Sequence, residues 1–246
     1  MRRVGLITGA KRGIGRGIAL AMAQSGCDLA LVDLDDDLGP MEDLRKTGAK
    51  VDYARCDLSD LGQHGPAIDQ LADKFGTFQI LVNNAGIASP RRDLFDALTP
   101  VNFDLVMNIN LRGTVFFTQK VLPHLRGHKA AIVNITSVSA AMTSPERLDY
   151  CLSKAGLSAF SQGLAVILAK QGVSVFEVRP GIIATGMTEG AKAKYDVAIA
   201  EGLVPQNRWG QPADIGAIVA SLASGTFAFA TGSIIHADGG LSLARL

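Results

Sequence analysis

The sequence is poor in the residues that stabilise small secreted proteins or bind nucleic acids. It has three cysteines with no C-x-x-C spacing, which excludes a disulfide framework and indicates reduced thiols in a cytosolic protein. Aromatic residues make up only 6% of the chain, so a core of aliphatic side chains is expected. The 24 basic and 23 acidic residues leave a net charge of +1, which gives no reason to expect a nucleic-acid partner.

Long apolar runs are also missing. No segment approaches the length that a membrane-spanning helix needs, and the N-terminal apolar run is far too short for a signal peptide. We therefore expect a cytoplasmic protein that does not bind membranes. With 246 residues, of which 48% are hydrophobic, the chain is long enough to bury one large core.

The sequence does contain a regular alternation of short apolar runs and helical stretches. The runs predict buried strands over residues 4–8, 29–33, 51–56, 80–83, 131–136, 173–178 and 233–237. Helices are predicted over residues 14–25, 37–47, 64–75, 101–126, 149–171 and 212–224. This alternation is typical of an α/β protein: a Rossmann-type, doubly wound parallel sheet with helices on both faces. We expect a single domain over residues 1–246, with an irregular substrate lid around residues 184–205.

A glycine-rich loop follows the first predicted strand. Gly9, Gly13 and Gly15 form a G-x-x-x-G-x-G pattern before an alanine-rich helix. Glycines let the backbone approach a diphosphate closely, and a helix N-terminus offers unpaired N–H groups to the anion. The spacing departs from G-x-G-x-x-G, so the position between a strand and a helix is the main evidence for a dinucleotide site.

The end of the second predicted strand bears on the choice of cofactor. Asp33 lies there, eighteen residues after Gly15, where an acid binds the adenosine ribose. A carboxylate at this place repels a 2′-phosphate, so NAD is preferred. Lys11 and Arg12 could instead reach a 2′-phosphate, which leaves NADP possible. The alternative interpretations are a solvated loop carboxylate and an exposed basic pair.

Tyr150 and Lys154 lie four residues apart in a predicted helix, thirteen residues after Ser137. At this spacing two side chains share one face of a helix, so the ammonium can approach the phenol and favour the phenolate. Lowering a phenol pKa by about three units needs roughly 4 kcal/mol, which is more than one screened lysine supplies. A second cation, such as an oxidised nicotinamide ring, is therefore expected beside this pair.

Together these motifs resemble the short-chain dehydrogenase/reductase family, and in particular its 3-oxoacyl-carrier-protein reductase-like branch, over nearly the whole chain. The motifs are residues 8–15, Asp57, residues 83–86, Asn110, Ser137, Tyr150 with Lys154, residues 179–181 and residues 238–240. The resemblance implies an NAD(P)-dependent oxidoreductase that interconverts a secondary alcohol and a ketone by hydride transfer.

The resemblance also implies a catalytic set of Ser137, Tyr150, Lys154 and Asn110. Tyr150 would be the general acid/base, and Lys154 would lower its pKa and hold the nicotinamide ribose. Ser137 would bind the substrate oxygen and is preferred to its neighbours Thr136 and Ser139 because of its spacing to Tyr150. Asn110 would hold a water in a proton relay; a buried amide that serves backbone groups is the alternative.

The cofactor contacts expected from the loop, the acid and the resemblance span the chain. They are Gly9, Lys11, Arg12, Gly13, Ile14, Gly15, Asp33, Asp57, Leu58, Asn83, Ala85, Gly86, Tyr150, Lys154, Pro180, Gly181, Ile183 and Thr185. In the family, the residue at Asp57 accepts from the adenine amino group, and residues 180–185 border the nicotinamide carboxamide. No metal site is expected.

The sequence says least about the substrate. Arg91, Arg92 and Arg147 are candidate anion contacts, although solvation or an ion pair between Glu146 and Arg147 is the preferred interpretation. The preference for NAD argues against the NADPH use expected of 3-oxoacyl-carrier-protein reductases. A small polar or carbohydrate-derived alcohol is therefore the preferred substrate, with 3-oxoacyl-carrier-protein reduction as the alternative.

Two other classes of protein remain as alternatives, namely a non-catalytic nucleotide-binding sensor and a methyltransferase. The pair Tyr150 and Lys154 argues against both. The predicted helices 101–126 and 149–171 carry more apolar surface than one face of a sheet needs, which predicts a homodimer or homotetramer.

Overall fold

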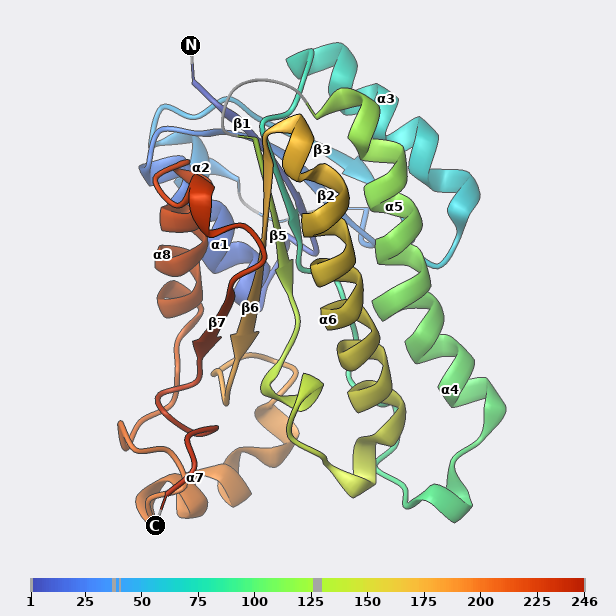
Figure 1. Ribbon diagram of the computed structural model, residues 1–246, viewed down its shortest axis with the longest axis vertical. Coiled ribbons are helices and arrows are strands. Elements are labelled where there is room, and N and C mark those ends of the chain that lie inside the picture. Colours follow the sequence, from blue (N-terminus) through green and yellow to red (C-terminus); the bar gives the residue numbers. More distant parts are fainter. Residues whose placement is uncertain (1, 37–38, 40, 126–129, 246) are drawn as a thin grey trace.

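Seven parallel strands form one sheet in the order β3-β2-β1-β4-β5-β6-β7 (Figure 1). The structure is a computed structural model that describes residues 2–36, 39, 41–125 and 130–245. The strands are β1 Val4–Thr8, β2 Asp28–Asp33, β3 Val51–Arg55, β4 Ile80–Asn83, β5 Ala130–Ile135, β6 Val173–Pro180 and β7 Ile234–Ala237. The strand order reverses between β1 and β4, and in open sheets of this kind ligands bind at the carboxyl ends of the strands beside that point.

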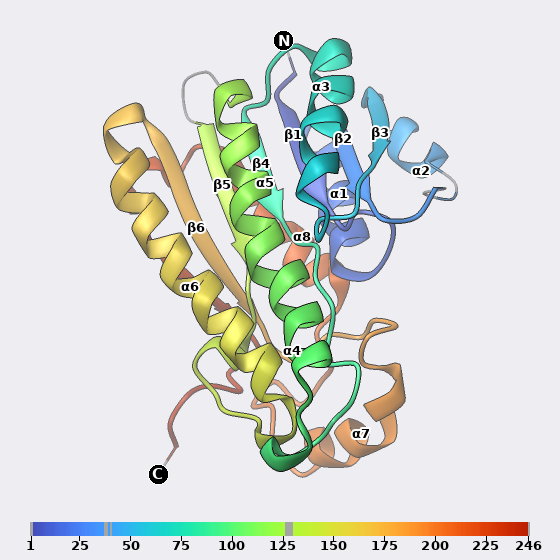
Figure 2. The same cartoon turned by 90° about the vertical axis from the view of Figure 1, so that its right-hand side faces the viewer.

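Helices cover both faces of the sheet (Figures 1 and 2). They are α1 Gly13–Gln24, α2 Glu42–Arg45, α3 His64–Phe75, α4 Pro100–Met107, α5 Thr114–Val121, α6 Leu148–Leu168, α7 Lys192–Ala200 and α8 Pro212–Ala223. α1, α2 and α8 lie against one face, and α3, α5 and α6 lie against the other. The predicted doubly wound fold is confirmed.

Each face of the sheet has its own apolar core. Successive residues of a strand point to opposite faces. In β1, Ile7 packs with Ile18 of α1 and Ile215 of α8, whereas Leu6 packs with Leu71 of α3 and Phe117 of α5. Strands that are buried on both sides need apolar residues at nearly every position, which is why their sequences are continuous runs.

The predicted helix over residues 101–126 is interrupted. α4 is followed by a π-helical segment, Asn108–Gly113, and then by α5 and a short 3-10 turn, Leu122–His124. Gly113 explains part of this geometry, because a Cβ on it would lie 2.3 Å from the carbonyl oxygen of Leu58. The predicted helix over residues 37–47 is also shorter, since α2 covers only Glu42–Arg45 and residues 37, 38 and 40 lie outside the described part.

The segment predicted to be an irregular lid contains a helix. α7 follows a 3-10 turn, Glu189–Ala191. Trp209 fastens it, since its Nε1 donates to Asp196 Oδ1 (2.8 Å) and its ring meets Tyr195 edge-on with centroids 5.8 Å apart. Only Ile199 of α7 is buried, so the sequence has no apolar period that would indicate a helix here.

Helix α6 differs from what the sequence led us to expect about long apolar segments. With its flanking turns, Pro145–Gln171, it is long and apolar enough to cross a membrane by length and composition. The expectation that no segment approaches that length is therefore wrong. The helix packs on the sheet and buries Asp149 and Lys154, and the core helices of sheet proteins pass the same test.

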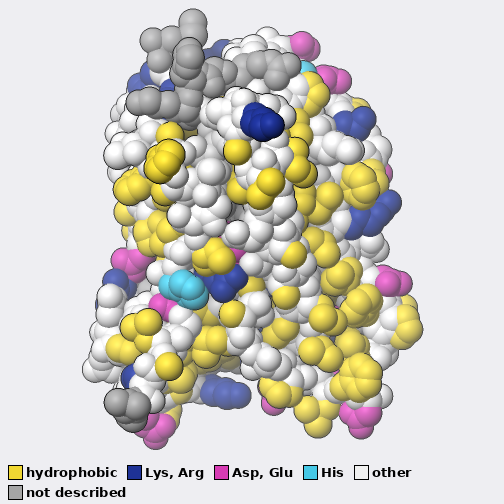
Figure 3. All heavy atoms as spheres, in the orientation of Figure 1, with side chains coloured by type: hydrophobic (Ala, Val, Ile, Leu, Met, Phe, Trp, Pro, Cys, Tyr) yellow, Lys and Arg dark blue, Asp and Glu magenta, His cyan; other side chains and the backbone are white. Residues whose placement is uncertain are grey.

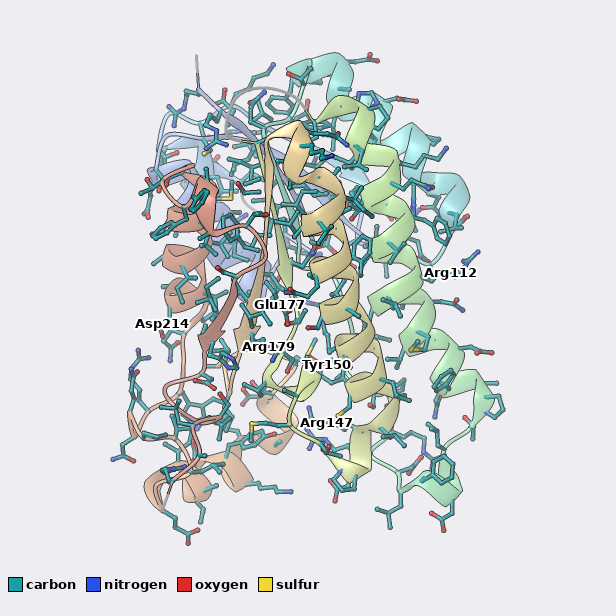
Figure 4. The ribbon with its side chains drawn as sticks, viewed as in Figure 1. Arg112, Arg147, Tyr150, Glu177, Arg179 and Asp214 are labelled. Atoms are coloured by element: carbon teal, nitrogen blue, oxygen red, sulfur yellow. The ribbon has the colours of Figure 1, made fainter. Side chains whose placement is uncertain are left out.

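A buried ion pair ties β6 to β5 and α6 (Figure 4). Arg179 Nε donates to Glu177 Oε1 at 2.6 Å, and the hydroxyls of Thr136 and Ser158 donate to the two Glu177 oxygens, each at 2.8 Å. The Glu177 side chain is 0% exposed and that of Arg179 is 11% exposed. Thr136 precedes Ser137, and Ser158 lies one turn beyond Lys154. The Glu177–Arg179 pair therefore fixes the end of β5 and helix α6 relative to one another.

Replacing Glu177 with alanine is expected to lower the free energy of unfolding by about 3–5 kcal/mol, because Arg179 is left charged and buried without its partner. The matched control is Arg208→Ala, which removes an exposed ion pair with Asp214 and should cost less than about 1 kcal/mol. Urea denaturation measures both. Equal losses in the two variants would contradict the structural role of Glu177.

Candidate active site

The four expected catalytic residues meet at the carboxyl ends of the strands. Ser137 follows β5, Tyr150 and Lys154 lie on α6, and Asn110 lies in the π-helical segment. Gly86, after β4, lies between two of them: a Cβ built on it would be 3.1 Å from Asn110 Oδ1 and 3.5 Å from Lys154 Nζ. The structure therefore gathers side chains from three separate segments, with the backbone of Gly86 from a fourth, at one place.

Tyr150 is buried and held as a proton donor. Burial raises the pKa of its phenol, while the hydrogen bond with Ser137 and the charge of Arg147 act in the opposite direction. The phenol is therefore protonated at neutral pH. A protonated phenol beside a serine hydroxyl provides two donors for an oxygen on which negative charge develops, as in the reduction of a ketone.

Lys154 lies on the same side of α6 as Tyr150, as its spacing predicts. Its Nζ is 5.7 Å from the centroid of the Tyr150 ring and donates to the carbonyl oxygen of Ile135 at 3.1 Å. Burial lowers the pKa of Lys154 to about 8. The lowering of the Tyr150 pKa expected from Lys154 stays a prediction for the cofactor-bound protein.

Asn110 is engaged by backbone groups. Its Oδ1 accepts from the Ile87 N–H (2.8 Å), and its Nδ2 donates to the Ile87 carbonyl (2.9 Å) and to Ser153 Oγ (3.2 Å). This is the alternative role weighed for Asn110, and it fixes the loop after β4 beside Lys154. The water relay stays a prediction.

The glycine loop fits a dinucleotide diphosphate. Gly9 has a φ of +65°, and a Cβ on it would lie 2.8 Å from the Cα of Ala85, so only glycine allows this close approach. Arg12 precedes the first turn of α1 without a side-chain cap, and that turn contains no acidic residue. The unpaired N–H groups of Gly13, Ile14 and Gly15 and the helix dipole would hold the anion.

Two residues that position this loop were not among the expected site residues. Thr8 Oγ1 accepts from the backbone N–H groups of Asn84 and Ala85, each at 3.1 Å. Asn84 Nδ2 donates to the carbonyls of Thr8 and Gly9, each at 3.0 Å. These bonds join the ends of β1 and β4 at the point where the strand order reverses. Both residues lie inside the motifs quoted above, but their partners are far away in the sequence.

Asp33 ends β2 with its carboxylate fixed by backbone donors. Oδ2 accepts from the Lys11 N–H and Oδ1 from the Leu34 N–H, each at 2.8 Å. The ammonium of Lys11 pairs with Asp35 at 3.0 Å, so its charge is directed to that carboxylate. Arg12 is exposed at the start of α1.

On the adenosine side of the expected site, some polar side chains already form hydrogen bonds within the protein. Asp57 Oδ1 accepts from the N–H and the hydroxyl of Ser59 (2.9 and 2.7 Å), and Leu58 beside it is buried. The amide of Asn83 points into the core, where Nδ2 donates to Thr118 Oγ1 and Asn134 Oδ1, each at 2.8 Å. Any cofactor contact of Asn83 would therefore come from its backbone.

The expected nicotinamide contacts lie in the chain after β6. Pro180 ends that strand, and a Cβ on Gly181 would lie 2.7 Å from the Cβ of Asp238. Ile183 is buried, while Thr185 reaches across to the glycine loop, within 3.3 Å of the place where a Cβ on Gly13 would lie. The structure thus brings the expected phosphate and nicotinamide contacts together on one edge of the sheet.

Comparisons with known proteins agree with this geometry. The family model described as enoyl-(acyl carrier protein) reductase matches residues 9–242. The chain is 33% identical over 245 residues to a 3-oxoacyl-[acyl-carrier-protein] reductase of Staphylococcus epidermidis, covering 98% of this chain and 99% of the relative. It is 32% identical over 242 residues to the 2-dehydro-3-deoxy-D-gluconate 5-dehydrogenase of Dickeya dadantii, covering 97% and 94%.

A solved structure is more similar still. The crystal structure of a 3-oxoacyl-[acyl-carrier protein] reductase from Brucella melitensis in complex with NAD superposes with a TM-score of 0.98 at 53% identity, covering 100% of this chain and 99% of that one. The chain belongs to the short-chain dehydrogenase/reductase family.

Members of the short-chain dehydrogenase/reductase family are NAD(P)-dependent oxidoreductases, and this chain is one of them. A bound nicotinamide would supply the hydride chemistry at the carbinol carbon. The geometry suits Tyr150 to donate a proton to the substrate oxygen in the direction of reduction and Ser137 to hold that oxygen with a hydrogen bond, and these roles stay predictions. The alternatives of a methyltransferase and a non-catalytic sensor lose their support.

One feature of this dehydrogenase site differs from the interpretation based on sequence. Arg147 does not pair with Glu146 in the described part of the chain; its Cζ lies 5.4 Å from the centroid of the Tyr150 ring. Arg91 pairs with Asp93 at 3.0 Å instead. The sequence places Arg147 three residues before Tyr150, but only the turn into α6 brings its side chain back over the ring.

Within the described residues, no cluster of three or more His, Cys, Asp or Glu side chains could hold a metal.

The burial of Lys154 has a consequence for stability that depends on pH. Its pKa is about 8 in the folded protein and 10.5 for an unperturbed lysine. Between these values the unfolded chain binds more protons, so this group makes the folded state more stable as pH rises through that window. Relative to Lys154→Met, the wild type should gain on the order of 3 kcal/mol of unfolding free energy across it.

Urea denaturation of both proteins at a series of pH values measures this difference. Lys170→Met, which removes an exposed lysine near the end of the same helical segment, is the control and should show no such trend. If the difference in unfolding free energy between wild type and Lys154→Met stays constant across this pH range, Lys154 keeps an ordinary pKa.

Proposed function

We propose that this enzyme interconverts a small polar secondary alcohol and its ketone, with NAD as its cofactor. The observation that supports NAD is the carboxylate of Asp33, which two backbone N–H groups hold at the end of β2. A 2′-phosphate on the adenosine ribose would meet this negative charge, and a like-charge contact of that kind costs several kcal/mol. The NAD bound to the Brucella melitensis relative supports the same choice.

The relatives favour two substrate classes. The 2-dehydro-3-deoxy-D-gluconate 5-dehydrogenase supports a polar, carbohydrate-derived alcohol. The 3-oxoacyl-[acyl-carrier-protein] reductases support the second candidate, the reduction of an acyl thioester. The polar alcohol remains our proposal because the site beside Tyr150 contains the half-buried cation of Arg147.

A substrate panel tests the proposal. Formation or consumption of NADH and NADPH is followed with polyols, sugars, hydroxy acids and 3-oxoacyl thioesters, with Tyr150→Phe as the control that lacks the proton donor. NAD-linked turnover of a polar alcohol, lost in Tyr150→Phe, supports the proposal. Turnover confined to NADPH and acyl thioesters would establish the second candidate instead.

Replacing Asp33 with asparagine is expected to reduce the preference for NAD over NADP, measured as the ratio of kcat/KM values, by about 100-fold, because the repulsion of the 2′-phosphate is lost. Asp36→Asn is the matched control, since it neutralises an exposed acid nearby that pairs with Arg55. An unchanged cofactor ratio in Asp33→Asn would mean that this carboxylate does not face the ribose.

The surroundings of the site complete the proposal. Residues 184–205, including α7, would act as the lid over the substrate.

Apolar side chains on α4, α5 and α6 remain exposed, among them Val101, Phe116, Val166 and Ile167, and Figure 3 shows hydrophobic side chains gathered over these helices. A homodimer or homotetramer would bury them. The cytoplasmic location predicted from the sequence stays a prediction.

Light scattering after size exclusion at micromolar concentration should give at least twice the chain mass of 25.8 kDa. A charge placed on the exposed apolar surface of α6, as in Val166→Glu, should shift the mass towards that of one chain, because burying an unpaired carboxylate is costly. A wild-type protein that is uniformly a single chain would remove the oligomer from the proposal.

A further inference from the structure

We propose that Arg147 binds a carboxylate of the substrate beside the reacting carbinol, so that the substrates are hydroxy acids and the corresponding oxo acids. The inference rests on the proposed function, since it names the class of polar alcohol that the site accepts. It makes Arg147 a specificity-determining residue that contacts the substrate.

The position of Arg147 supports this role. Its guanidinium Cζ is 5.4 Å from the centroid of the Tyr150 ring, and the side chain is half-buried (Figure 4). Tyr150 is the residue that gives its proton to the substrate oxygen. A group bound by Arg147 therefore lies within a few bond lengths of the reacting carbon.

Arg147 also has unused hydrogen-bonding capacity. Its one side-chain bond within the described residues is a long contact of 3.3 Å from Nε to Ser144 Oγ. Other arginines of the chain have carboxylate partners, as Arg179 has Glu177 and Arg208 has Asp214, but no carboxylate in the described residues lies within ion-pair distance of Arg147. A guanidinium has five N–H donors in a planar fork that matches a carboxylate.

The charges around Arg147 leave it available to an anion. Asp149 is buried two residues further on, where its Oδ1 accepts from the Ser89 hydroxyl and the Tyr150 N–H. Glu146 is exposed to solvent. Lys154, the other cation of the site, is buried and donates to a backbone carbonyl. Arg147 is thus the cation that lies over the Tyr150 ring without a carboxylate partner in the described residues.

Helix α7 lies near this position, since the phenol of Tyr195 contributes to the raised pKa of Tyr150. Tyr195 is in turn held by the edge-on contact with Trp209. A hydroxy acid between Arg147 and α7 would have its carboxylate on the guanidinium and its carbinol under Tyr150 and Ser137. A 3-oxoacyl thioester has no carboxylate to place there.

Matched pairs of ligands test the inference. Lactate, 3-hydroxybutanoate and gluconate are each compared with their neutral amides. Binding to the NAD-loaded Tyr150→Phe protein is measured by calorimetry, because this variant keeps the ring under Arg147 and does not turn the ligands over. At least one acid should bind about 10- to 100-fold more tightly than its amide, the range expected of a charge-assisted hydrogen-bonded pair.

The same measurement is then made after Arg147→Gln. The advantage of the acid over its amide should disappear, while the affinity of the amide stays within about threefold, since a neutral ligand gains nothing from the charge. Arg147→Lys keeps the charge without the planar fork and should retain part of the advantage. Arg112→Gln is the matched control, because Arg112 also lies over an aromatic ring, Phe116 at 5.9 Å, away from Tyr150 (Figure 4).

Several outcomes would overturn the inference. One is that none of the three acids binds better than its amide; another is that Arg147→Gln weakens acid and amide equally. Failure of the proposed function looks different. In that case an acid binds through Arg147, but the protein with Tyr150 intact shows no NAD-linked turnover of it. NAD-linked turnover restricted to neutral alcohols would uphold the proposed function and refute the role of Arg147.

Discussion

The site depends on the burial of one face of α6 against the carboxyl ends of the sheet. Burial has opposite effects on its two ionisable groups: it keeps the phenol of Tyr150 protonated and lowers the pKa of Lys154 to about 8. Burial thus disfavours the charged form of each group, although Lys154, with a pKa of about 8, remains mostly protonated at neutral pH. The polar network around Glu177 and the amide of Asn110 keep the surrounding segments in place while this desolvation is maintained.

The sheet and the site are joined by hydrogen bonds between segments that are distant in the sequence. Thr8 and Asn84 join β1 to β4 at the reversal of the strand order, and the glycine loop lies on that junction. The buried acid of Glu177 connects the strand end before Ser137 with the helix of Lys154. Two separate sets of polar contacts therefore position the glycine loop and the segments that carry Ser137 and Lys154.

Sequence patterns predicted the strands to within two residues at each end, because strands covered on both faces must be apolar throughout. Helical spacing also predicted that Tyr150 and Lys154 share one face, and the family resemblance together with its spacing to Tyr150 predicted Ser137 beside them. They did not reveal the π-helical turn at Asn110, which depends on the contact between Gly113 and Leu58. Helix α7 has a single buried residue, so its sequence has no apolar period. The position of Arg147 over the Tyr150 ring depends on the turn into α6, which produces no periodic pattern in the sequence.

The bond between Trp209 and Asp196 also makes the lid observable. The chain contains a single tryptophan, and its indole lies at the junction between α7 and the segment before α8. The tryptophan fluorescence of the protein therefore comes from one indole whose hydrogen bond and edge-on tyrosine neighbour exist only while α7 keeps this position. The native chain thus has a built-in optical reporter of whether α7 keeps this contact, with no need for an attached dye.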